Sequence, residues 1–180
     1  MTVIRTSQFE RLAKKNKRVV KLEKMMDSGL FSIDTHKLTN ELFTLHGTRN
    51  IRNLSSSDVL GSAQKKLLDI ALENVAKRSR CVEIKMKAYR VARSLEQHLA
   101  DMFNYLYSRY SDQLREEFRA ITDRKSAVTA ILQPFYNLLH KLKTVESLAD
   151  MVISDCDQTG YATTNMTKAI EIAFARERNI

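Results

Sequence analysis

The sequence predicts an all-α protein built from long helices. Its 180 residues include only four Gly and one Pro, and a chain so poor in these two residues can form long uninterrupted helices. No segment alternates apolar and polar residues for long between turn residues, and no Asn-Gly or Asp-Gly pair is present to close a β-hairpin. Apolar residues recur instead at intervals of three and four. We therefore expect an antiparallel helical hairpin or bundle.

A basic helix is expected near the amino terminus. Ser7 and Glu10 have the spacing of a capping box, in which each side chain bonds the backbone N–H of the other residue. This start predicts a helix that runs to about Met26, with its apolar residues on one side. The basic run 14–18 lies on the opposite side and is expected to face solvent.

A second, shorter helix is expected between about residue 35 and residue 47, where a glycine ends the pattern. The polar segment 48–57, which contains Ser, Asn and Arg, is typical of a linker or an exposed loop. We therefore divide the chain into two parts. Residues 1–52 form a basic N-terminal helical appendage, and residues 53–180 form a helical core with a basic long helix and C-terminal oligomerisation helices.

A long helix is expected from about Asp58 to Arg109, because this span contains no Pro and only one Gly. On a helical wheel its apolar residues form two stripes on nearly opposite sides. The first stripe comprises Ile84, Ala88, Val91, Leu95, Leu99, Met102 and Leu106, and the second comprises Val75, Val82, Met86 and Tyr89. A helix with two apolar stripes must be covered on two sides, either by a closed bundle or by other subunits.

The most regular apolar pattern lies further along the chain, where spacings of three and four alternate. This heptad seam comprises Val128, Ile131, Phe135, Leu138, Leu142, Val145, Ala149 and Val152. Such a seam is typical of a coiled coil between subunits and also of an amphipathic helix in a monomeric bundle. We assign it to oligomerisation. Pro134 is expected to kink the helix or to begin a new one, and the chain is expected to turn before Gly160 and to end in a helix over residues 164–178.

Together, two stretches of the sequence have a larger net positive charge than the whole chain. Residues 5–24 contain eight Lys or Arg against two Glu, and residues 65–93 contain nine against three acidic residues, so each has a formal charge of +6. The whole chain has +9, so the remaining residues sum to −3. Because both stretches are expected to be helical, this charge lies along two rods and attracts polyanions. Lys-rich helical faces are, however, often only solvated surface.

These basic residues are the candidate nucleic-acid-binding residues. On the long helix they are Lys77, Arg78, Arg80, Lys85, Lys87, Arg90 and Arg93, and on the N-terminal helix they are Lys14, Lys15, Lys17 and Arg18. Tyr89 and Tyr105 offer ring faces on which unpaired bases stack, although tyrosines at helical spacing are more often part of a core. No base-reading motif is present. Binding is therefore expected to depend on the phosphate backbone and to weaken steeply with salt.

The sequence favours a non-enzyme without a cofactor or metal. It contains no phosphate-binding glycine loop, no HExxH or GxSxG motif and no calcium loop. Cys81 and Cys156 are far apart and lack zinc-ligand spacing, which favours free thiols in a reducing compartment. No apolar run is long enough for a signal peptide or a membrane span. We therefore expect a cytoplasmic protein without a membrane partner.

From about Leu54 to the end, the order of features resembles the UvsY family of phage recombination mediators. The features are, in order, a long basic helix at 65–93, a tyrosine pair in 103–107, an acidic-basic turn at 118–125, a Leu-aromatic segment at 131–139 and a closing helix. The resemblance implies a homo-oligomer in the host cytoplasm that binds single-stranded DNA and helps load a recombinase onto DNA covered by single-strand-binding protein. The family's basic pair before the tyrosines falls here near Ala100 and Met102, which are not basic. The resemblance therefore leaves residues 77–93 as its candidate DNA contacts.

Two other interpretations stay open. The first is a structural or scaffold protein that assembles through the heptad seam and binds no nucleic acid. The second is a double-stranded DNA regulator that uses residues 7–46 as a helix-turn-helix. Its spacing is poor, because about seven residues separate the two helices where three or four are usual, and its second helix contains only Lys37 as a basic residue.

Overall fold

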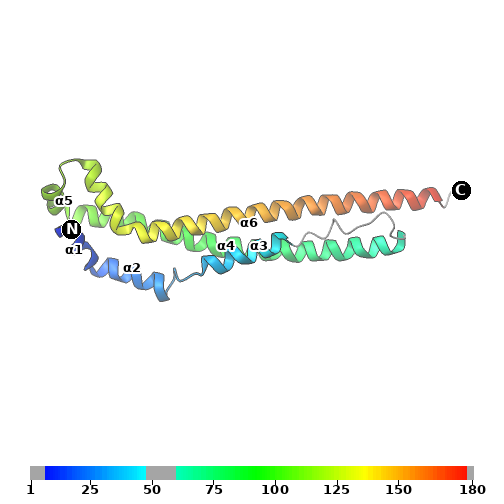
Figure 1. Cartoon of the computed structure of the whole chain (residues 1–180), viewed down its shortest axis with the longest axis horizontal. Helices are drawn as coiled ribbons and strands as arrows, with labels where there is room; N and C mark the ends of the chain where they lie inside the picture. The colour runs from blue at the N-terminus through cyan, green and yellow to red at the C-terminus, as the bar shows by residue number, and fades with distance from the viewer. Residues whose placement is uncertain (1–6, 48–59, 178–180) are drawn as a thin grey trace, which may run out of the picture. The chain divides into compact units, whose positions relative to one another are not determined.

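The computed structural model describes residues 7–47 and 60–177, and all regular structure within these ranges is α-helical, which confirms the all-α prediction. The described helices are α1 (Gln8–Lys14), α2 (Lys17–Ser28), α3 (Thr35–Gly47), α4 (Leu60–Arg109), α5 (Ser111–Glu117) and α6 (Ile121–Glu177) (Figure 1).

The chain forms two compact units. Unit 1 contains residues 1–34 and 88–144, and unit 2 contains residues 35–87 and 145–180. Both long helices therefore contribute to both units, and the first fifty residues are shared between them. The boundary predicted near residue 52, like the linker 48–57, lies outside the described residues.

The helix predicted near the amino terminus forms as two helices. Ser7 caps α1, because its hydroxyl oxygen accepts a hydrogen bond from the backbone N–H of Glu10 at 3.0 Å. Asn16 caps α2 in the same way and accepts from the backbone N–H of Arg18 at 2.9 Å. A side-chain cap of this kind satisfies a backbone N–H that would otherwise have no helical partner. The helix therefore ends at Lys14 and begins again after Asn16.

The predicted second helix is confirmed as α3, with Leu38 and Leu42 buried. The predicted long helix is confirmed as α4. Helix α5, which packs against α1 in unit 1, was not predicted from the sequence. In each unit the α4 segment lies beside the α6 segment (Figure 1).

The long helices are antiparallel. In unit 2, Lys85 of α4 binds Asp150 of α6, and Arg78 binds Asp157. The residue numbers therefore fall along α4 as they rise along α6.

The heptad seam of α6 is buried within the single chain. Seven of its eight side chains are at most 8% exposed, and Leu138 is half-buried. Helix α4 supplies buried side chains of the first predicted stripe, including Ile84, Leu95 and Leu106. A seam that its own chain covers has no free surface for a second subunit. The predicted oligomerisation residues are therefore corrected to an intramolecular core, and these are Val128, Ile131, Phe135, Leu138, Leu142, Val145, Ala149 and Val152.

Of the two alternatives predicted at Pro134, the start of a new helix is wrong, because Pro134 lies inside α6, and a kink there stays a prediction. The predicted turn before Gly160 is absent, because α6 continues to Glu177. Beyond the seam, Cys156 and Thr163 are buried at 5% exposure each and continue its spacing. The burial of these two side chains offsets the loss of helix stability caused by Gly160, since a glycine inside a helix costs about 1 kcal/mol relative to alanine.

The second predicted stripe of α4 stays uncovered. Val75 is 66% exposed, Met86 is 42% exposed and Tyr89 is 45% exposed, whereas Val82 is half-buried. The described part of this chain therefore does not supply the cover that two apolar stripes require.

Candidate nucleic-acid interface

Positive charge is concentrated in unit 1. By sequence, unit 1 contains 17 Lys and Arg against 10 Asp and Glu, a net charge of +7. Unit 2 contains 13 against 11, a net charge of +2. A polyanion is therefore attracted more strongly to unit 1.

Most of the predicted basic residues of α4 in unit 2 bind carboxylates. Three ion pairs, with their N–O distances, are Lys77–Glu73 (2.7 Å), Arg78–Asp157 (2.8 Å) and Lys85–Asp150 (2.6 Å). The two aspartates belong to α6, so the acidic side chains of one long helix neutralise the basic side chains of the other. Binding a phosphate here would require these cations to leave or share a carboxylate.

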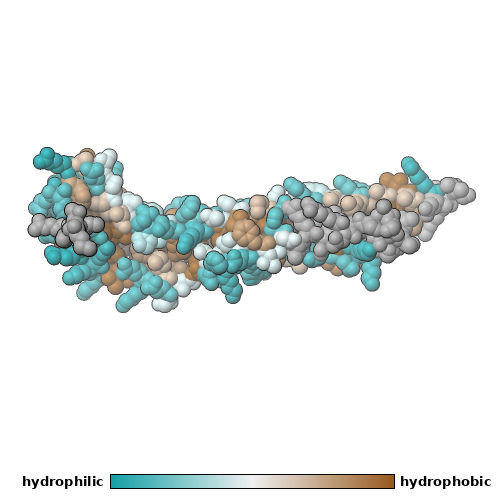
Figure 2. Space-filling model, in the orientation of Figure 1, coloured by the Kyte–Doolittle hydropathy of each residue, from teal (hydrophilic) through white to brown (hydrophobic). Residues whose placement is uncertain are grey.

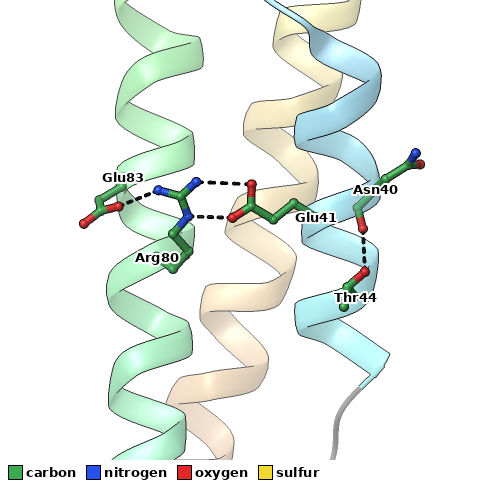
Figure 3. Close-up of polar contacts among 5 residues, drawn as sticks. All are labelled: Asn40, Glu41, Thr44, Arg80 and Glu83. Carbon is green, nitrogen blue, oxygen red and sulfur yellow. Dashed lines mark hydrogen bonds and ion pairs between the residues drawn. The ribbon is translucent and has the colours of Figure 1, made fainter.

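Arg80 binds two carboxylates at once (Figure 3). Its Nε and one terminal nitrogen donate to the two oxygens of Glu41 on α3 at 2.6 and 3.2 Å, and its other terminal nitrogen donates to Glu83 at 2.8 Å. The hydrogen bond from Arg80 lowers the pKa of Glu41, and the hydrogen bond to Glu41 raises the pKa of Arg80. This guanidinium therefore holds α3 on α4 and has little capacity left for a phosphate.

The other predicted α4 cations are more open. Lys87 and Arg90 are exposed and form no ion pair with any described residue. Arg93 contacts Glu96 at 3.4 Å, and Glu96 also accepts from Lys143 of α6 at 3.0 Å. The hydrogen bond from Lys143 lowers the pKa of Glu96. Two of the seven predicted α4 cations thus form no ion pair with a described carboxylate, although the charge of Lys87 contributes to lowering the pKa of Glu41.

Helices α1 and α2, together with Lys15 between them, present a group of exposed basic residues in unit 1. We define the N-terminal basic surface as Arg11, Lys14, Lys15, Lys17, Arg18, Lys21 and Lys24, all of which are exposed. Among the residues that the structure describes, one ion pair involves this set, between Lys14 and Glu10 at 2.6 Å. Figure 2 shows hydrophilic side chains over the region of α1 and α2.

The sequence prediction named four members of this surface and missed Arg11, Lys21 and Lys24. The signal was present, because Lys17, Lys21 and Lys24 are spaced four and three apart and so share one side of α2. The buried Val19 and Leu22 lie on the other side. The three lysines therefore form a row of positive charges along the helix.

Hydrogen bonds fix the N-terminal basic surface to the rest of unit 1. The side-chain NH₂ of Asn16 donates to the hydroxyl of Tyr105 at 3.2 Å and to the hydroxyl of Tyr110 at 2.9 Å. The backbone N–H of Phe9 donates to Glu117 of α5 at 2.9 Å. The Phe9 ring also meets the Tyr110 ring edge to face, with centroids 5.8 Å apart. Polar and aromatic contacts together hold both short helices in place.

The two predicted stacking tyrosines differ. Arg18 lies over the ring of Tyr105 with 4.0 Å between the guanidinium carbon and the ring centroid, so one face of this ring is occupied. Tyr89 is 45% exposed. Of the two, Tyr89 is therefore better placed to stack on a base, and stacking at Tyr105 would require displacement of Arg18.

A groove lies beside Lys14 in unit 1. Its lining includes Ser7, Phe9, Glu10, Lys14, Asp123 and Ser126. Lys14 lines this groove together with the carboxylates of Glu10 and Asp123, so the groove is a poor site for an anion. The row of lysines on α2 is a better site for a phosphate backbone.

The described residues hold no group of three or more His, Cys, Asp or Glu arranged to bind a metal ion. Both cysteines are free and buried. Burial raises the pKa of Cys81 to about 11 and also raises the pKa of Cys156, so both thiols are protonated at neutral pH and poorly reactive. Among the helices that the structure describes, none is long and apolar enough to cross a membrane.

Comparison of the chain with protein-family models, with curated proteins and with solved structures found no match. The resemblance to the UvsY family therefore rests on the sequence features alone and stays a prediction.

Proposed function

We propose that this chain is a non-catalytic accessory protein that binds single-stranded DNA through the N-terminal basic surface. The supporting observation is that this surface holds seven exposed cations with one ion pair, within a unit of net charge +7. Cations without carboxylate partners can bind phosphates and release counterions at no loss of an internal contact. Relative to the sequence prediction, the main site moves from α4 to α1 and α2, with Arg90 and Lys87 as secondary contacts.

The preference for single-stranded DNA rests on the resemblance, and the position of α3 argues against the helix-turn-helix alternative, which would bind duplex DNA. As a recognition helix α3 would have to enter a groove, but Glu41 on α3 is bound to Arg80 of α4. Six residues, 29–34, also separate α2 from α3, which is long for a helix-turn-helix. Loading of a recombinase onto DNA covered by single-strand-binding protein is the finer expectation, and its support is the resemblance.

Replacement of Lys15, Lys17, Lys21 and Lys24 by Gln tests the site. We expect the affinity of the full chain for a fluorescent oligo-dT, measured by anisotropy at near-physiological salt, to fall by at least about tenfold, because four phosphate contacts are lost. Glutamine removes the charge, stays polar and has a helix propensity close to that of lysine, so the fold is retained.

The matched control removes four charges from exposed positions of unit 2 that are not assigned to DNA binding, by replacement of Lys65, Lys66, Lys168 and Arg176 with Gln. Both variants have the same net charge, so only the position of the lost charge differs. We expect a much smaller loss of affinity in the control. Equal losses in the two variants would show that binding follows net charge and would refute the assigned surface.

A scaffold without nucleic-acid binding is the second candidate, and the exposed second stripe of α4 favours it. A chain that self-associates but leaves the anisotropy of oligo-dT and of a matching RNA unchanged near physiological salt would establish this alternative.

A further inference from the structure

Helix α4 has an exposed apolar stripe in unit 2 that is longer than the sequence predicted. Its residues are spaced alternately four and three apart, and they are Leu68, Leu72, Val75, Ser79, Val82 and Met86. Leu68 is 59% exposed, Leu72 is 62% exposed and Val75 is 66% exposed. We call this set the α4 stripe. Large apolar side chains at heptad spacing on a helix surface are typical of a coiled-coil seam.

The α4 stripe lies on the side of α4 away from the core of unit 2. The buried residues Leu67, Cys81 and Ile84 occupy the opposite side of the helix, where α6 packs. Helix α6 also has exposed apolar residues in unit 2, namely Met151, Tyr161, Met166 and Ile172. Met151, Tyr161 and Ile172 share one side of α6, but the heptad positions between them hold the polar residues Ser154, Gln158, Asn165 and Lys168. A regular uncovered seam is therefore a property of α4.

The core of unit 2 contains polar residues, so burying the α4 stripe against a further helix would add apolar contacts that unit 2 lacks. Asn74 lies at a core position of α4 and donates to the backbone carbonyl of Cys156 at 2.7 Å. Lys77, whose side chain is 15% exposed, lies at the next core position. Thr163 is buried on α6. With polar residues at core positions, two long helices bury little apolar surface, and a further helix on the open side would add a second core.

The charges beside the α4 stripe select a second copy of this chain as the occupant. Asp69, Glu83 and Arg90 lie along one edge of the stripe, and Arg78 and Lys85 lie along the other edge. When two copies pack in parallel, Arg78 of each copy meets Glu83 of the other, and Lys85, which would face Arg90, is neutralised by Asp150 of its own chain. Antiparallel packing instead brings Arg78 and Lys85 of the two copies together.

Arg78 can make this contact without leaving its own chain. It binds Asp157 through Nε, which leaves the two terminal nitrogens to donate to Glu83 of the second copy. Parallel packing in register also places each stripe residue against its own equivalent, so that no apolar side chain faces a charge.

We propose that copies of this chain assemble in parallel through the α4 stripe. Two of the three d positions, Val75 and Val82, are β-branched, and none of the a positions, Leu72, Ser79 and Met86, is, a distribution that favours three or four strands over two. The proposal does not rest on DNA binding, because the stripe and the N-terminal basic surface share no residue.

Replacement of Leu72 by Glu tests the surface. Light scattering of the full chain without nucleic acid, at moderate salt to screen its +9 charge, is expected to give three or four times 20.8 kDa for the original sequence. Leu72→Glu is expected to weaken assembly by at least about a hundredfold, because each copy would bury a carboxylate, and to give 20.8 kDa with unchanged helical circular dichroism.

The matched control is Ile172→Glu, which places the same charge at an exposed apolar position of α6 and should keep the assembled mass. A monomeric original chain, or an assembled Leu72→Glu variant, would overturn the proposal. The monomeric Leu72→Glu variant should still bind a short oligo-dT, so failure of this proposal and failure of the DNA-binding proposal give different results.

Cross-linking tests the parallel orientation. In a parallel assembly the two Ser79 side chains face one another, so Ser79→Cys should form a disulfide-linked dimer on mild oxidation and lose it on reduction. The original chain, with Cys81 and Cys156 buried, and Lys87→Cys, outside the stripe, should not cross-link. Dissociation by Leu72→Glu without cross-linking of Ser79→Cys would overturn the parallel arrangement.

Discussion

Two arginines show how the fold decides which cations are available to a ligand. Both Arg18 and Arg80 are basic residues on helices and look equivalent in the sequence. In the fold, Arg80 binds Glu41 and Glu83, and Arg18 lies over the ring of Tyr105. An arginine that stacks on a ring keeps its N–H donors for phosphate, whereas an arginine held by two carboxylates does not. Arg18 therefore stays a candidate contact, and Arg80 becomes a structural residue.

The Arg80–Glu41 ion pair predicts a pH dependence of stability. The hydrogen bond from Arg80 holds the pKa of Glu41 in the fold below its usual value of 4.5. Its stabilising contribution is therefore fully present above that value and is lost as pH falls through the lower pKa of the folded state. Urea unfolding followed by circular dichroism should show a smaller loss of stability between neutral pH and about pH 3 in Glu41→Gln than in the original chain.

The effect should be small, because the pair is partly open to solvent and is screened. Glu171→Gln is the matched control, since Glu171 is exposed and has no ion pair with a described residue. If Glu41→Gln and Glu171→Gln lose stability in parallel on acidification, the ion pair contributes nothing measurable.

At the scale of the helices, the sequence predicted which segments are helical better than it predicted where each helix begins and ends. The capping signal of Ser7 located the start of α1, and a span without Pro and with a single Gly located α4. The failures came from Asn16, whose capping capacity was overlooked, and from Gly160, which was taken as a turn. Cys156 and Thr163 continue the seam past that glycine, but small and polar side chains give a weak apolar signal. The sequence therefore contained the capping and glycine signals, but only the packing of the folded chain determined which of them end a helix.

Gly160 gives the prediction at this scale. A Cβ added there would meet only the side-chain nitrogen of Asn74, at 3.8 Å, which is ordinary contact. Gly160→Ala should therefore raise the free energy of unfolding by roughly 0.5–1 kcal/mol, because alanine loses less backbone entropy in a helix. Thermal unfolding monitored by circular dichroism measures the gain.

Ser147→Ala, at an exposed position of the same helix, is the control and should give a smaller gain. A lower melting temperature for Gly160→Ala than for the original chain would indicate that residue 160 lies in a turn and not in a continuous helix.

The whole molecule separates its charge into a strongly basic unit and a nearly neutral unit. Unit 1 has +7 and unit 2 has +2, because residues 145–180 bring acidic side chains to unit 2, and two of them, Asp150 and Asp157, bind basic residues of α4. The sequence could not show this division, since each unit consists of two segments that are distant along the chain. The two basic stretches have the same formal charge in the sequence, but ion pairs between α4 and α6 neutralise part of the second stretch in the structure. Assembly through the α4 stripe would multiply the charge of unit 1 within one particle and so strengthen the binding of a long strand.

The most direct measurement of this account is the affinity for oligo-dT as a function of salt, compared between the original chain and the variant with Lys15, Lys17, Lys21 and Lys24 replaced by Gln. The original chain should show a steep fall of affinity with salt, and the slope of log affinity against log salt should be shallower in the variant by about 3, at about 0.7 for each lost phosphate contact. Equal slopes for the two proteins, or no binding by the original chain in dilute buffer, would contradict the central claim that the N-terminal basic surface binds single-stranded DNA.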